Sequence, residues 1–204
     1  TAWSDGYLTG GEVIPWTNIV TGINAASYTQ NWSVNFAALP NLAYSYITVR
    51  VYDNAGNLKT QNVFSAYKNA SAPAITDNQP GDDTWRSANT GTYNVDFQSQ
   101  SGQNLDKFQV RASTSAAGGP YNPDWTDVVT TIGAADYTAN WQLPASVFSA
   151  MQAGRNYASV RIFDLVPSSG ASNNVFYVQK DTSAPEIADG QAGDTAWRAS
   201  AGTL

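Results

Sequence analysis

The sequence predicts an all-β protein built from repeated β-sandwich units, and three observations support this prediction. Thr, Tyr, Val and Trp, which favour strands, are plentiful, together with the turn formers Asn, Gly, Asp and Ser. Several segments alternate apolar and polar residues with the period of two that a half-buried strand requires. The second half of the chain also repeats much of the first half. At 204 residues, the chain has room for two units of about 100 residues.

The internal repeat consists of four collinear matches. The longest, WTNIVTGINAASYTQNW against WTDVVTTIGAADYTANW, pairs residues 16–32 with residues 125–141 at 11 of 17 positions without a gap. The others are YITVRVYD with YASVRIFD, NVFSAYK with NVFYVQK, and SAPAITDNQPGDDTWR with SAPEIADGQAGDTAWR. The spacing between equivalent residues changes only from 109 to 112, so small changes in loop length account for it.

The matches divide the chain into three parts. Residues 71–182 form one complete unit, residues 1–70 correspond to the C-terminal part of a preceding unit, and residues 183–204 correspond to the N-terminal strands of a following one. Each seam reads K-x-x-S-A-P, and its Pro predicts a short, stiffened linker between strands of consecutive domains.

The complete unit contains about seven predicted strands. In TYNVDFQ the apolar residues alternate with polar ones, and KFQVRAS, VVTTI, DYTANWQL, YASVRIFD and NNVFYVQK supply further strands. The sequence predicts one helical turn in this unit, in the segment ASVFSAMQAGRN. From the alternation and from the repeated aromatic positions we expect eight core residues: Trp32, Trp141, Tyr46, Tyr157, Val95, Phe97, Val160 and Ile162.

The run YITVRVYDNAGN, followed by a strand and then SAP, resembles the closing strands and linker of bacterial Ig-like repeats. Such repeats occur in tandem in very large secreted surface proteins, including adhesins and cell-wall fibres. The resemblance implies immunoglobulin-like β-sandwich domains of about 110 residues with about seven strands each. It also implies an extracellular or cell-surface location. One departure is visible, because the second copy replaces the DNAGN turn with DLVPSSGASN.

Composition argues against several functions. The chain has no His and no Cys, so it lacks the residues of catalytic triads and of most transition-metal sites. The pairs Asp82/Asp83 and Asp124/Asp127 are close enough for a glycosidase-type site, but turn roles account for them, and we expect no enzyme. The net charge of −6 and the scattered basic residues disfavour nucleic acid. No apolar run is long enough to span a membrane.

The acidic residues near the linkers raise the question of calcium, which takes carboxylate and carbonyl oxygens. The candidate ligands are Asp77, Asp181, Glu186 and Asp189, and the resemblance implies that junctions of this kind are often stiffened by calcium. Two observations argue against a calcium site. The first linker has Asn69 where the second has Asp181, and the sequence contains no D-x-D-x-D run. Solvated acidic loops are the alternative, and no other cofactor is predicted.

Seven Trp residues suggest either packing or sugar binding. Six recur in pairs across the repeat, which favours packing, and Trp85 and Trp197 follow the linkers, where they would pack at a domain junction. The residues whose exposure would favour a carbohydrate-binding module are Trp3, Tyr7 and Tyr121.

Together these features predict a segment of a structural array that forms an extended rod, stalk or filament. Its expected partners are neighbouring repeats of the same protein, other copies in a fibre or sheath, and surface glycans. The alternative is a carbohydrate-binding β-sandwich module. Neither terminal part contains a counterpart of residues 93–109, which include Val95 and Phe97. We therefore expect further repeats on both sides, because neither part would close a core by itself.

Overall fold

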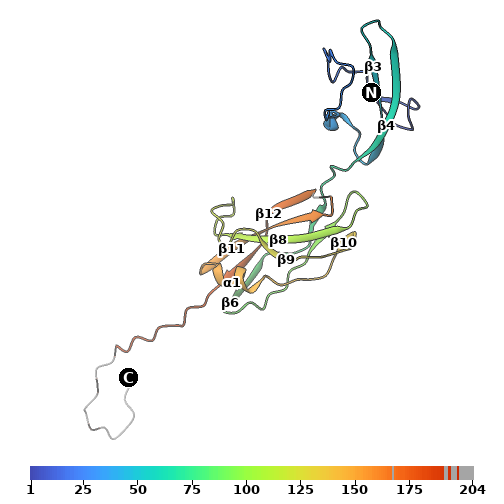
Figure 1. Ribbon diagram of the computed structural model, residues 1–204. Helices are drawn as coiled ribbons and strands as arrows, with labels where there is room; N and C mark the ends of the chain where they lie inside the picture. The colour runs from blue at the N-terminus through green and yellow to red at the C-terminus, as the bar shows by residue number, and fades with distance from the viewer. Residues whose placement is uncertain (167, 191–192, 194–196, 198–204) are drawn as a thin grey trace.

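The computed structural model describes residues 1–166, 168–190, 193 and 197. Its strands gather into two bodies that follow one another along the chain, and residues 181–190 extend away from the second body (Figure 1). We call residues 1–68 the first unit and residues 74–180 the second unit. Among the described residues, no helix is long and apolar enough to cross a membrane.

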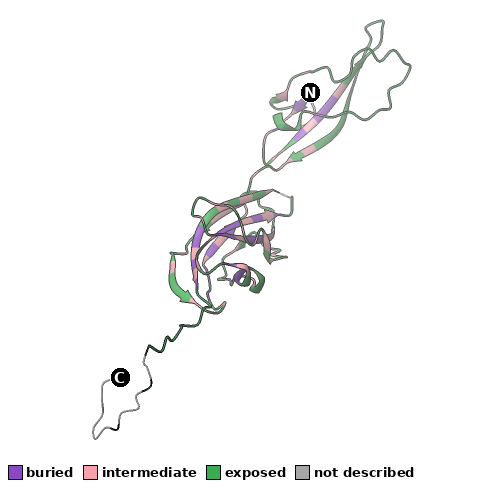
Figure 2. Ribbon diagram, turned by 90° about the vertical axis from the view of Figure 1, so that its left-hand side faces the viewer, coloured by how far each residue is buried: buried purple, intermediate pink, exposed green. Residues whose placement is uncertain are grey.

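The first unit is a four-stranded sheet with the order β2-β1-β3-β4. Its long hairpin pairs β3 with β4 in antiparallel register, and β1 pairs with the other edge of β3. The elements are β1 Ala2–Trp3, β2 Glu12–Ile14, the 3₁₀ helix η1 Phe36–Ala38, β3 Ala43–Tyr52 and β4 Leu58–Lys68. Only Ala2, Leu39 and Ile47 form its buried apolar cluster, so much of the sheet is exposed (Figure 2).

The second unit contains two sheets and one short helix. A three-stranded sheet has the order β10-β7-β5, and a five-stranded sheet has the order β6-β12-β11-β8-β9. All neighbours are antiparallel except β6 and β12, which run parallel. The elements are β5 Ala74–Asp77, β6 Asp82–Arg86, β7 Val95–Gln98, β8 Leu105–Ser113, β9 Thr126–Val129, β10 Asp136–Tyr137, α1 Ala145–Ala150, β11 Gly154–Asp164 and β12 Ser169–Lys180. The chain is therefore all-β and its second unit is β-sandwich-like.

The core of the second unit contains side chains from both sheets. Tyr93 stacks on Phe176 with ring centroids 4.1 Å apart, and Trp141 meets the edge of Phe108 at 5.2 Å. Five of the expected core residues are buried here: Val95, Phe97, Trp141, Val160 and Ile162. The cluster is continuous from β7 to β12, so each sheet covers the apolar face of the other.

The other three expected core residues lie elsewhere, and the prediction for them is wrong. Tyr157 is half-buried on the outer face of β11, because the period of two that buries Ala158 and Val160 turns Tyr157 outward. Its repeat equivalent Tyr46 is half-buried on β3, where its ring meets the ring of Tyr7.

Trp32 is 37% exposed. It keeps one contact of its equivalent, since its ring lies 5.9 Å from that of Phe64 while Trp141 lies 5.8 Å from Phe176. The rings of Tyr93 and Phe108, which cover Trp141, have no counterpart in the first unit. Burial of this Trp therefore depends on rings from neighbouring strands, Tyr93 beside it and Phe108 in the opposing sheet, and not on its own strand.

Candidate functional sites: the linkers and the outer sheet face

The two linkers begin with the same polar turn. In the first, the backbone N–H of Ser71 donates to Oδ1 of Asn69 at 3.1 Å, and in the second Ser183 donates to Oδ1 of Asp181 at 2.9 Å. Asn and Asp side chains both carry an Oδ1 acceptor, so either residue can form this turn, which explains why the first linker has Asn69 and the second has Asp181. Asn41 adds a second tie to the first linker, because it accepts from the Ala70 N–H at 2.6 Å and donates to Ser71 Oγ at 2.7 Å.

The first linker packs against the β11–β12 hairpin of the second unit. Pro73 is buried, and its carbonyl oxygen lies so close to Gly170 that a Cβ there would collide with it. Gly170 follows the turn that stands in place of the DNAGN turn of the first unit. The first residue of each turn, Asp164 or Asp53, bonds the backbone of its own turn in the same way. Asp164 Oδ1 accepts from the second and fourth following N–H groups at 3.0 and 2.9 Å, and Asp53 does the same at 2.9 and 2.8 Å. The longer turn therefore keeps the shared bend and adds a contact to the linker.

A lysine at the end of each unit's last strand binds the carbonyl groups of the short helix. Lys180 Nζ donates to the carbonyl oxygens of Phe148, Ser149 and Met151 at 2.8–2.9 Å, and the lysine is only 8% exposed. Lys68 Nζ donates in the same manner to the carbonyls of Ala37 and Leu39 at 2.8 and 2.9 Å. A cation at unpaired helix-end carbonyls is favourable, and it fixes the strand from which each linker departs.

The calcium candidates do not gather in the structure. Asp77 and Asp181 each use one carboxylate oxygen to close a local turn, and Glu186 and Asp189 lie exposed in the extended segment after the second unit. Among the described residues, no three His, Cys, Asp or Glu side chains come close enough to hold a metal ion. Junction calcium stays a prediction.

The paired carboxylates each have a partner of their own. Burial raises the pKa of Asp82. The hydrogen bond and the charge of Arg86, which lies 2.8 Å away, lower this pKa, and together with the hydrogen bonds of Thr84 they outweigh burial, so the net shift is downward. Asp83 accepts from the Tyr177 hydroxyl at 2.7 Å. The segment from Asp82 to Arg86 is strand β6, whereas the sequence suggested a turn for Asp83, because pairing with β12 overrides the local turn signal.

Asp124 accepts from the Trp125 N–H at 2.8 Å. Asp127 forms an ion pair with Lys107 at 3.1 Å, and this contact, with the Gln109 hydrogen bond, lowers the pKa of Asp127. Neither pair therefore presents two free carboxylates to a common space.

The predicted surface aromatics differ in exposure. Trp85 is 59% exposed on β6 and Trp197 is fully exposed, so neither packs at a junction within the described residues. Tyr7 packs edge-on against Tyr46, and Trp3 is half-buried. Tyr121 carries the Arg111 guanidinium 3.4 Å above its ring, so this ring face is not free for a sugar.

Sequence reasoning missed one feature, the gathering of cations on the outer face of the five-stranded sheet. Lys107, Arg111, Arg155 and Arg161 lie there, although they are far apart along the chain. The signal that was available is their position at alternating places in β8 and β11, opposite the buried residues.

No family model and no curated protein matches this chain. Its function is therefore argued from the geometry of the linkers and of this outer face.

Proposed function

We propose that the protein is a segment of a tandem array of immunoglobulin-like β-sandwich domains, which works as an extended extracellular rod, stalk or filament and not as an enzyme. Its partners are neighbouring repeats and further copies of the same protein. The observation that carries the proposal is the shared construction of the two unit ends. Both have a lysine bound to helix carbonyls, followed by an Asx turn and the sequence SAP.

This construction favours extension because the chain leaves each unit in a defined direction. The lysine holds the end of the last strand, the Asx turn orders the next residues, and the Pro restricts the backbone before the following unit begins. In the first linker, the contact of Pro73 with Gly170 also limits rotation of the second unit about the linker. Strands of roughly ten residues give each unit a length of about 33 Å, so each added repeat would lengthen the rod by a similar step.

Small-angle X-ray scattering tests the proposal on the chain as it stands. A variant with Gly-Gly-Ser inserted after Ser71 should show a broader distribution of interatomic distances, because the three residues separate the Asx turn, which ends at Ser71, from Pro73. The matched control carries the same insertion after Ala55, in the β3–β4 turn, where it leaves the linker unchanged. Scattering from a compact particle with the two units folded side by side would contradict the rod, as would identical profiles for both insertions.

A carbohydrate-binding module that stacks sugars on Trp3, Tyr7 or Tyr121 receives less support. Tyr121 is covered by a guanidinium, and Tyr7 and Trp3 are half-buried.

A further inference from the structure

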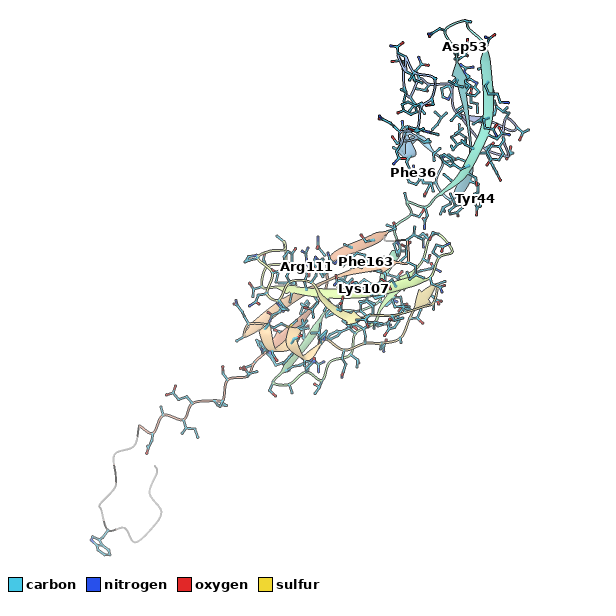
Figure 3. All side chains as sticks on the ribbon, viewed as in Figure 1. Phe36, Tyr44, Asp53, Lys107, Arg111 and Phe163 are labelled. Atoms are coloured by element: carbon cyan, nitrogen blue, oxygen red, sulfur yellow. The ribbon has the colours of Figure 1, made fainter. Side chains whose placement is uncertain are left out.

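The outer face of the second unit carries a continuous stack of cations and aromatic rings. The Arg111 guanidinium lies 4.2 Å from the centroid of the Trp125 ring, and the Arg161 guanidinium lies 4.5 Å from the same ring. Arg161 also lies 5.2 Å from Phe163, over which Lys107 Nζ lies at 5.8 Å. Figure 3 shows Arg111, Phe163 and Lys107 close together on this part of the unit. We call Arg111, Trp125, Arg161 and Phe163 the cation–aromatic stack.

The two arginines of the stack have neutral hydrogen-bond partners. Arg161 Nε donates to Gln109 Oε1 at 2.5 Å, and the terminal nitrogen of Arg111 donates to Asn173 Oδ1 at 3.1 Å. The other two cations of the face form ion pairs, Lys107 with Asp127 at 3.1 Å and Arg155 with Asp83 at 3.5 Å. Within the described residues, no ion pair involves Arg111 or Arg161. Asp127 interacts with Arg161 electrostatically without a direct ion pair. Two guanidinium groups without a direct carboxylate partner among the described residues therefore lie side by side in a chain of net charge −6.

The same arrangement recurs in the first unit. Arg50, the repeat equivalent of Arg161, lies 4.1 Å from the Trp16 ring centroid and 5.5 Å from that of Tyr52. Trp16 and Tyr52 are the equivalents of Trp125 and Phe163. A guanidinium in contact with two aromatic rings is therefore present in both units, once in the first unit and twice in the second.

We propose that the cation–aromatic stack binds an acidic polysaccharide, through the carboxylate groups of its uronate residues. Both guanidinium groups already lie against the Trp125 ring, so in this proposal the partner meets the edges of the arginines and not this aromatic ring. Arginine edges present paired N–H donors that match a carboxylate in bidentate geometry. Stacking on the rings holds the guanidinium planes in place, which lowers the entropy lost on binding.

The surroundings of the stack fit a polyol better than the surface of another protein. The outward polar side chains beside the stack that solvent reaches are Asn173 and Tyr157, whose amide and hydroxyl groups can donate to and accept from sugar hydroxyls. Gln109 and Ser159 are buried and bonded within the protein. A ring-bound guanidinium in each unit also suits a polymer, because a long polyuronate can contact Arg50 in the first unit and the stack in the second and gain affinity through multivalency. This inference is independent of whether the units form a rod.

The test uses the whole chain and polygalacturonate oligosaccharides, with binding measured by calorimetry in 50 mM salt. Wild-type protein should bind, and binding should weaken at 500 mM salt, because the contact is between opposite charges. The double variant Arg111→Gln/Arg161→Gln should bind at least tenfold more weakly. Lys59→Gln, which removes one exposed cation from β4 of the first unit, is the control and should bind as wild type does.

Three results would overturn the proposal. They are the absence of wild-type binding in 50 mM salt, equal binding of a neutral dextran, and unchanged affinity in a folded double variant. A concentration-dependent sedimentation shift that the double variant abolishes, without polyuronate binding, would instead assign the face to a second copy of the chain.

If the double variant does not fold, Arg111→Lys/Arg161→Lys replaces it. This variant keeps the charge but loses the paired donors, so it should bind at least threefold more weakly, and unchanged affinity would overturn the proposed carboxylate contact.

Discussion

Replacement of Trp141 by Ala tests the two-layer core of the second unit. Trp141 is 4% exposed, and its ring lies 5.2 Å from Phe108, 5.8 Å from Phe176 and 6.0 Å from Tyr93. Removal of a large buried aromatic costs about 3–5 kcal/mol, and each lost ring pair contributes about 0.5–1.5 kcal/mol within that range. We therefore expect the free energy of unfolding of the second unit to fall by about 4 kcal/mol.

Trp32→Ala is the matched control within the same chain. Trp32 occupies the equivalent repeat position but is 37% exposed and pairs with one ring, that of Phe64. Its loss should lower stability by about 1–2 kcal/mol, because less apolar surface returns to water and fewer ring contacts are lost. The same chemical change at equivalent positions thus isolates the contribution of the rings of Tyr93 and Phe108, which have no counterpart in the first unit.

Urea denaturation followed by far-ultraviolet circular dichroism measures both effects. The transition of the second unit should move in Trp141→Ala and stay in place in Trp32→Ala. Equal losses at the two positions would refute the reasoning, because they would mean that Trp32 is as well covered in solution as Trp141. Repeating Trp32→Ala over a hundredfold range of protein concentration would then show whether another copy supplies the cover.

Three further predictions follow from single contacts in the second unit. Lys180→Met should lower the free energy of unfolding in urea by about 3 kcal/mol, because three carbonyls, two of them buried, lose their donor. Lys68→Met should cost less, because only two carbonyls lose a donor and neither contact is fully buried. Burial raises the pKa of Tyr93 to about 12, so its contribution to stability is complete below pH 10 and is lost between pH 10 and 12. Between pH 9 and 12 the wild type should therefore lose about 2–3 kcal/mol more than Tyr93→Phe, and parallel curves would contradict this. Gly170→Ala should displace the first linker and change the scattering profile, whereas Gly190→Ala, with open space around it, should not.

The alternation along the strands was sufficient to predict much of the second unit. Val95 and Phe97 in β7, and Val160 and Ile162 in β11, are buried because the period of two leaves one side of each strand facing the opposing sheet. The same rule applied to β11 would have placed Tyr157 outside, since it lies three positions before Val160 and an odd step changes the face of the strand. The prediction for Tyr157 failed because it relied on the large aromatic side chain and on its recurrence in the repeat, and not on the alternation of apolar and polar residues along the strand.

Non-local contacts could not be predicted in the same way. Trp32 and Trp141 lie in similar sequences, and their different burial follows from rings that lie on other strands. Strand β6 was missed for a related reason, because the Asp-rich segment from Asp82 has turn propensity and becomes a strand only through parallel pairing with β12. In both cases the deciding contact joins residues far apart along the chain.

The cations of the outer face show that a cluster of charge can also arise from residues that lie far apart along the chain. Along the sequence the basic residues are scattered, which disfavours a polyanion when charge runs alone are considered. The pairing of β8 with β11 sets Arg161 opposite Gln109 and Ser159 opposite Arg111, so two guanidinium groups from distant segments meet across one sheet face. In an all-β protein, charge clusters form across strands at alternate positions and not along them. The net charge of −6 therefore describes long-range repulsion, while affinity for a carboxylate depends on the local arrangement of Arg111 and Arg161 over Trp125.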